Sequence, residues 1–198
     1  MKLKEDGATK RFQTTIHYQN TEDHPSIATA IRKLIPKSSV AQIVVVCIGT
    51  DRSTGDSLGP LVGMHLQDHG LNNAAVYGTL DNPVHAVNLE ETITTIHTVY
   101  DSPFIIAIDA CLGKLSNVGN ICVASGPVLP GAGVNKKLTP VGDMNITGIV
   151  NVSGYMEYSV LQNTRLGIVM KLSQVISQSL LLALTSHVIE PPIIRYGS

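Results

Sequence analysis

The chain has 198 residues, of which 43% are hydrophobic and 15% are charged. This balance excludes a disordered chain, and the length suits one domain with a buried core. The formal net charge is -1, with 14 Lys and Arg residues against 15 Asp and Glu residues. Because these charges balance and no basic stretch longer than Lys136–Lys137 occurs, we expect neither nucleic acid nor an anionic membrane as a partner.

The amino-terminal residues are polar and charged where a secretory signal would need an apolar run, so we expect a cytoplasmic protein. The most apolar stretch, residues 180–184, is much shorter than the roughly 20 residues that cross a bilayer. Three widely spaced cysteines are expected to be reduced thiols, without a disulfide framework or a zinc site: Cys47, Cys111 and Cys122.

Predicted elements alternate along the chain after a flexible polar segment at residues 1–22. We predict helices at residues 27–35, 58–69 and 86–97. Between and after them we predict buried strands at residues 42–48 and 104–108 and a short strand at residues 75–77. Two further strands and a long amphipathic helix follow at residues 118–124, 148–152 and 163–187. This alternation predicts a three-layer α/β/α fold with a mostly parallel central sheet. Residues 23–190 would form the single domain and residues 191–198 a tail.

Aspartates stand where the two buried strands are expected to end. Asp109 directly follows the apolar run 104–108, and Asp56 lies in the Gly- and Ser-rich loop between the strand 42–48 and the helix 58–69. In open α/β sheets, ligands bind outside the carboxyl ends of the strands, so we expect both carboxyl groups in one site. An alternative for Asp56 is a helix N-cap, which is compatible with a place in the site.

Two carboxyl groups brought close together repel, so one is expected to hold a proton while the other is ionised. Such a pair can act as general base and general acid in hydrolysis, or it can hold a divalent metal ion that activates water. Candidate metal ligands are Asp56, Asp109 and His85, although a local hydrogen bond at a helix start also explains His85. Asp51 is a third carboxyl candidate in the same loop.

The sequence Gly-Asp-Ser-Leu-Gly at residues 55–59 also matches the G-x-S-x-G pattern of a GDSL-type serine esterase. Ser57 is several residues beyond the predicted strand, however, and the expected Asp-x-x-His near the end of the chain is missing. This esterase is therefore a minor alternative. No dinucleotide or P-loop spacing is present, so we expect no nucleotide cofactor; the glycines would allow a tight loop close to a substrate backbone.

Several motifs together resemble those of the germination protease of spore-forming bacteria, both in their residues and in their order along the chain. They are VVVCIG at residues 44–49, GDSLGP at 55–60, IAIDA at 106–110 and LPGAGVNKKL at 129–138. With VYGTLDNPVH at residues 76–85, the wider segment is similar to the YyaC sporulation proteins, which are shorter relatives of that protease. The resemblance covers about residues 43–154.

This resemblance implies a fold similar to that of the hydrogenase maturation proteases, which use acidic residues around a nickel site. It implies catalytic roles for Asp56 and Asp109, and hence a peptidase-like hydrolase of sporulation or germination that cleaves a peptide or small protein. We expect a substrate-facing loop that includes Asp51, Gly131, Gly133, Asn135 and Lys136.

The alternative that stays open is a non-catalytic sporulation protein that binds a peptide or protein partner at the same site. The expected location is the cytoplasm of the mother cell or forespore, and a homo-oligomer is one open assembly state. The sequence departs from the germination protease in being much shorter, which leaves the substrate undefined.

Overall fold

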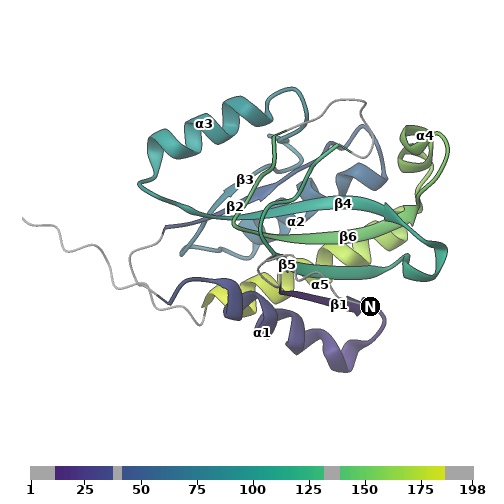
Figure 1. Cartoon of the computed structure of the whole chain (residues 1–198), viewed down its shortest axis with the longest axis horizontal. Helices are drawn as coiled ribbons and strands as arrows, with labels where there is room; N and C mark the ends of the chain where they lie inside the picture. The colour runs from purple at the N-terminus through teal and green to yellow at the C-terminus, as the bar shows by residue number, and fades with distance from the viewer. Residues whose placement is uncertain (1–11, 38–41, 132–138, 186–198) are drawn as a thin grey trace, which may run out of the picture.

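The structure, a computed structural model, describes residues 12–37, 42–131 and 139–185. Within them, six strands form one sheet in the order β1-β5-β6-β4-β2-β3 (Figure 1). The strands are β1 (Gln13–His17), β2 (Ile43–Cys47), β3 (Ala75–Tyr77), β4 (Phe104–Gly113), β5 (Asn120–Ser125) and β6 (Met144–Val152). The helices are α1 (His24–Leu34), α2 (Leu58–Asp68), α3 (Leu89–Val99), α4 (Glu157–Gln162) and α5 (Leu166–Thr185).

The central strands are parallel. β3, β2, β4 and β6 each pair in parallel with the next strand in this order, whereas β5 is antiparallel to both β6 and β1. All five residues of β2 are buried, because this apolar strand lies inside the sheet and is covered on both faces. The prediction of a mostly parallel sheet around the run at residues 42–48 is confirmed.

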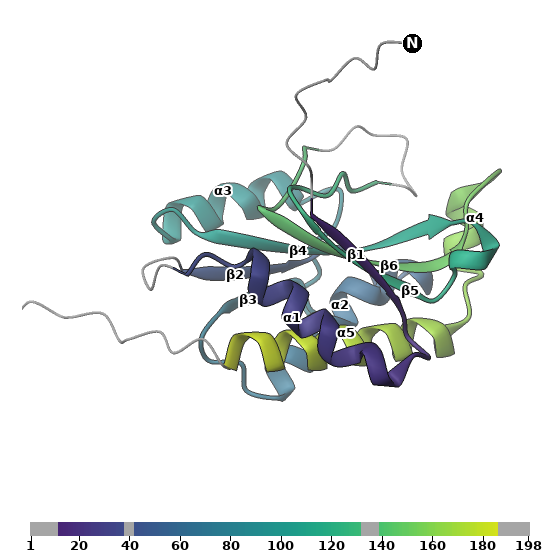
Figure 2. The same cartoon turned by 60° about the horizontal axis from the view of Figure 1, so that its bottom comes forward.

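Helices cover both faces of the sheet. Val45 of β2 belongs to a core shared with α1, α2 and α5, whereas Val44 and Val46 pack in a second core with Leu89 and Ile96 of α3. Figure 2 shows α3 on one side of the sheet and α1, α2 and α5 on the other. The predicted three-layer α/β/α fold is therefore confirmed.

β4 is longer than predicted. It continues through Asp109 to Gly113, because β6 pairs with it as far as Val152. β2 stops earlier, with Cys47 paired to Ile108, so Asp109 is the first residue of β4 beyond the end of β2. Asp109 thus lies within a strand and not in the loop that the sequence suggested, but it still marks the carboxyl edge of the inner sheet.

The two ends of the described chain compare differently with the sequence expectation. Residues 13–17, placed in a flexible segment by their polarity, form the edge strand β1, which pairs with β5 and buries Ile16. The long helix expected at residues 163–187 is present as α5, whereas the short helix α4 that precedes it was not predicted. The expected tail at residues 191–198 lies outside the described residues.

Among the described helices, α5 is long and apolar enough to cross a membrane by length and composition alone. It packs against α1 and α2, and half of its apolar window is buried inside the molecule. Its buried side chains belong to the same core as those of β2 and β4. These contacts are those of the core helix of a folded domain.

Candidate active site

The loop after β2 folds back tightly onto the start of α2. Gly49 has a φ of 143°, and a Cβ at this position would lie 1.9 Å from the carbonyl oxygen of Asp56. The Thr50 N–H donates a hydrogen bond to that same carbonyl oxygen at 3.1 Å. The glycine therefore allows a close approach within the chain itself, rather than to a substrate backbone, and this approach holds Asp56 beside the end of β2.

Asp109 is positioned by β4 and is only 7% exposed. Its Oδ1 accepts a hydrogen bond of 2.9 Å from the N–H of Ala110. Directly after the adjacent strand β2, the Ile48 N–H donates to the Ile108 carbonyl at 2.7 Å, which extends the contact between the two chain segments up to the aspartate. The carboxyl group is consequently held in a rigid part of the sheet.

One pocket of about 410 Å³ brings these residues together. Asp56 and Asp109 both line it, so the sequence prediction that they share a site agrees with their placement. Three more predicted residues also line this pocket: Asp51, His85 and Gly131. The other members of the expected substrate loop, Gly133, Asn135 and Lys136, lie outside the described residues.

The two carboxyl groups are electrostatically distinct. Burial raises the pKa of Asp56 to about 6, while a backbone hydrogen bond from Thr50 and the charge of His85 act to lower it. Burial also raises the pKa of Asp109 well above its ordinary value, and the negative charge of Asp56 raises it further. Burial and the charge of Asp56 therefore both favour the protonated form of Asp109, which is the more buried of the two carboxyl groups.

His85 lies in the segment before α3, which begins at Leu89 and not at residue 86 as predicted. Its Nδ1 accepts a long hydrogen bond of 3.4 Å from the backbone N–H of Val87. The backbone N–H of His85 donates to Asn88 Oδ1 at 2.8 Å. Its side chain also lines the pocket and acts on Asp56 through its charge. The local hydrogen bond and the place in the site are both present.

The structure argues against two alternative roles in the Gly55–Ser57 turn. Asp56 lies inside this 3-10 turn, and no side-chain cap hydrogen bond occurs at the start of the turn or of α2, so Asp56 is not an N-cap. Ser57 is buried, and its hydroxyl donates to the Thr54 carbonyl at 2.7 Å. A hydroxyl used in this way is not the exposed nucleophile of a serine esterase.

The three cysteines are free thiols in the structure. Cys47 is fully buried, and burial raises the pKa of its thiol strongly. Burial also raises the pKa of Cys111 to about 11, although this residue lies two positions after Asp109. Neither thiol is a thiolate near neutral pH, so neither is suited to act as a nucleophile.

The sequence is similar to a known protein family and to a protein of Bacillus subtilis. The family described as "Protein of unknown function (DUF1256)" matches residues 15–179. The chain belongs to this family. It is 51% identical over 174 residues to "Uncharacterized protein YyaC" of Bacillus subtilis (strain 168), covering 88% of this chain and 85% of the relative.

Among solved structures, the chain is similar to the NiFe hydrogenase maturation protease HycI from Thermococcus kodakarensis KOD1. The TM-score is 0.42 at 15% sequence identity, and the match covers 76% of this chain and 97% of that one. The order and direction of the six strands establish the α/β architecture of this DUF1256 member independently of that match.

A metal ion was one sequence-based expectation for this DUF1256 member. Among the residues that the structure describes, no group of three or more His, Cys, Asp or Glu side chains could hold a metal ion. The candidate ligands Asp56, Asp109 and His85 therefore do not fit a resident ion as a set.

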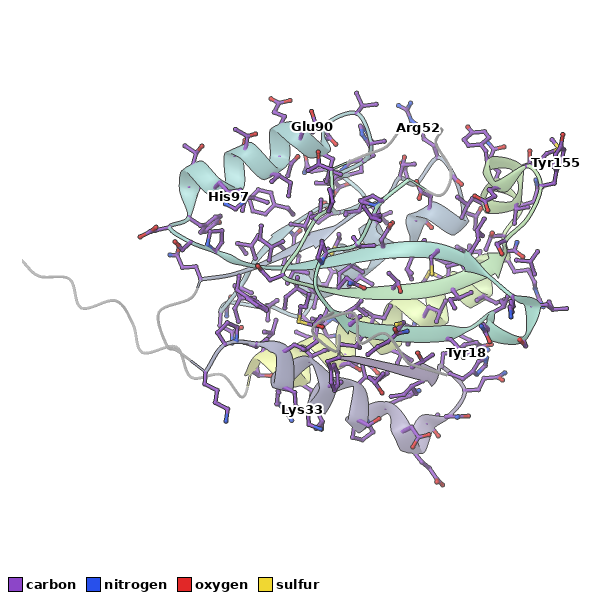
Figure 3. The ribbon with its side chains drawn as sticks, viewed as in Figure 1. Tyr18, Lys33, Arg52, Glu90, His97 and Tyr155 are labelled. Atoms are coloured by element: carbon purple, nitrogen blue, oxygen red, sulfur yellow. The ribbon has the colours of Figure 1, made fainter. Side chains whose placement is uncertain are left out.

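Other pocket residues of this DUF1256 member were missed by the sequence interpretation. Arg52 and Ser53 belong to the loop after β2, and Tyr158 and Leu161 come from α4. Figure 3 shows the Arg52 side chain extending outward from that loop. α4 contacts the Gly55–Ser57 turn, which is distant in sequence. No local pattern in residues 157–162 predicts this tertiary contact.

Proposed function

We propose that this protein is a hydrolase that cleaves a peptide bond with Asp56 and Asp109 as an acid–base pair. The observation that carries the proposal is that both carboxyl groups line one pocket and both have raised pKa values, with Asp56 raising that of Asp109. Two carboxyl groups that ionise at different pH supply a base and an acid at the same pH.

In this mechanism, ionised Asp56 takes a proton from a water molecule whose oxygen attacks the substrate carbonyl carbon. The carbonyl electron pair moves onto oxygen. When the tetrahedral intermediate collapses, the carbon–nitrogen bond breaks and its electron pair goes to nitrogen, which takes the proton of Asp109. Asp56 is then protonated and Asp109 ionised, and exchange with solvent restores both. The buried position of Asp109 suits the acid, since burial favours its neutral form.

For the biological setting, we propose a role in sporulation or germination, with a peptide or small protein as substrate. The motifs at residues 55–60, 106–110 and 129–138 support this, because they resemble those of the germination protease. A Bacillus subtilis relative of 51% identity supports it as well. The proposed location is the cytoplasm of the mother cell or forespore.

The direct test is digestion of a protein extract from spores, followed by mass spectrometry of new peptide ends. We expect the wild-type protein to generate such ends both with added divalent metal ions and with EDTA, because the described donors do not form a metal site. The matched control is Asp56→Asn, which should generate none. Cleavage by Asp56→Asn at the wild-type rate would rule out the proposed mechanism. Loss of wild-type cleavage in EDTA would show that the reaction needs a metal ion.

The pH dependence of cleavage is a second expected result. Asp56 must be ionised to act as a base, so kcat/KM should fall about tenfold per pH unit below about 6. It should fall again at high pH as Asp109 loses its proton, because the acid is then missing. Initial rates from pH 4 to pH 10 on one cleaved peptide measure both limbs. A rate that is constant between pH 4 and pH 7 would contradict the assignment of Asp56.

A second candidate function is the binding of a partner without cleavage. The observation that favours it is the exposed apolar surface around the pocket, where Val87 is 87% exposed and Tyr158 is 58% exposed, and both line the pocket. Exposed apolar side chains at a pocket mouth are common in binding sites. This function predicts that the wild-type protein retains peptides without cutting them, and that Asp56→Asn retains them equally well.

A further inference from the structure

One side chain in the pocket is not used by the mechanism above. Ser53 lies in the loop between β2 and Asp56, lines the pocket and is only 7% exposed. Its hydroxyl oxygen is buried and has no hydrogen-bond partner among the described residues. A buried hydroxyl without a partner lowers the stability of a folded protein, so such groups are rare and need an explanation.

A ligand in the pocket explains this hydroxyl. The serine side chain turns about a single bond, and no hydrogen bond holds it in its present direction. It can therefore turn toward a group in the pocket at little cost. The loop that carries Ser53 also carries Asp56, and both residues line the same pocket.

The attack described above leaves a negative charge on the substrate carbonyl oxygen. In the proposed mechanism Asp56 has by then taken the proton of the water, and the proton of Asp109 goes to the leaving nitrogen, so neither carboxyl group is assigned to this oxygen. A hydroxyl can donate a hydrogen bond to the oxygen and, because it is uncharged, it does not shift the pKa of either carboxyl group through a charge. Hydrogen-bond donors to the oxygen that becomes charged contribute strongly to catalysis of this kind.

We propose that the Ser53 hydroxyl donates a hydrogen bond to the carbonyl oxygen of the peptide bond that is cleaved. The inference rests on the proposed function, since it assumes a peptide substrate at Asp56 and Asp109. It assigns this loop a second contact with the substrate, on the carbonyl oxygen rather than on the attacking water.

Ser57 provides a matched control four positions away. It is buried to the same degree, at 6% exposed, but its hydroxyl donates to the Thr54 carbonyl and it is not among the described pocket residues. Removing a hydroxyl that makes a hydrogen bond lowers the stability of the folded protein, whereas removing a buried hydroxyl without a partner does not. Ser57→Ala should lower the melting temperature by about 2–4 °C, whereas Ser53→Ala should leave it unchanged or raise it.

The experiment measures cleavage of a pool of synthetic peptides by mass spectrometry, and then kcat and KM on the peptide that is cleaved fastest. For Ser53→Ala we expect kcat to fall about 10- to 100-fold with a smaller change in KM, because the oxygen becomes charged only during the reaction. Ser57→Ala should keep the wild-type kcat in the folded protein. Unchanged kcat for Ser53→Ala, or a melting temperature as low as that of Ser57→Ala, would overturn the inference.

A binding measurement separates this inference from the hydrolase mechanism. The same peptide pool is passed over immobilised Asp56→Asn protein, with and without the additional Ser53→Ala change. If the wild-type protein cuts no peptide, the proposed function fails. The hydrogen bond to a bound carbonyl would still be supported if the protein with both changes retained at least threefold less peptide than Asp56→Asn alone. Equal retention by both proteins, or no retention by either, would then reject it.

Discussion

Asp56→Asn and Asp109→Asn should each lower the cleavage rate about 100- to 10,000-fold and, at pH 7.5, raise the melting temperature. The second effect follows from the pKa values, both of which are raised in the folded state. The folded protein then binds the proton more tightly than the unfolded chain, so stability falls as pH rises above the unfolded pKa of about 4. For Asp56 this loss is complete above about pH 6.

Asparagine cannot ionise, so each variant avoids that loss. With a pKa raised from 3.8 to about 6, Asp56→Asn should increase the free energy of unfolding on the order of 2 kcal/mol at pH 7.5 and very little at pH 4. Thermal unfolding at the two pH values measures this difference. Asp51→Asn, an exposed aspartate of the same loop, is the control and should leave the melting temperature almost unchanged. Variants that unfold at lower temperature than the wild type at pH 7.5 would identify the carboxyl groups as structural.

The location of the acidic pair could be predicted because it depends on local sequence and on one rule of topology. The apolar runs at residues 42–48 and 104–108 are visible as buried strands, and parallel strands end at the same edge of a sheet. A carboxyl group near the end of each run is therefore expected at that edge. Asp56 and Asp109 do line one pocket there, although their catalytic roles stay a prediction.

Other features depend on contacts between distant residues. The second half of β4 is a strand only because β6 pairs with it, and β1 is a strand because β5 pairs with it. Tyr158 reaches the pocket through the packing of α4 on the Gly55–Ser57 turn. The unpaired hydroxyl of Ser53 follows from the three-dimensional surroundings of one side chain. None of these contacts has a periodicity or motif in the sequence.

Gly59→Ala should destabilise the protein strongly, because Gly59 is where α2 touches the end of β2. A Cβ at this position would lie 2.1 Å from the carbonyl oxygen of Ile48 and 2.7 Å from its nitrogen. Both are backbone atoms, and the Ile48 N–H is already bonded to the Ile108 carbonyl. Neither can move without separating α2 from the sheet, so we expect the free energy of unfolding to fall by about 3 kcal/mol or more.

Gly167→Ala is a matched control, since Gly167 is the second residue of α5 as Gly59 is of α2. Nothing lies within 4 Å of a Cβ at Gly167, so alanine should stabilise the protein by about 0.5–1 kcal/mol. Urea unfolding of both variants measures the contrast. Because the same contact holds the turn that carries Asp56, Gly59→Ala should also lower cleavage by the protein that is still folded. Equal stability of the two variants would show that the glycine of the Gly-Asp-Ser-Leu-Gly sequence is not needed to seat α2 against β2.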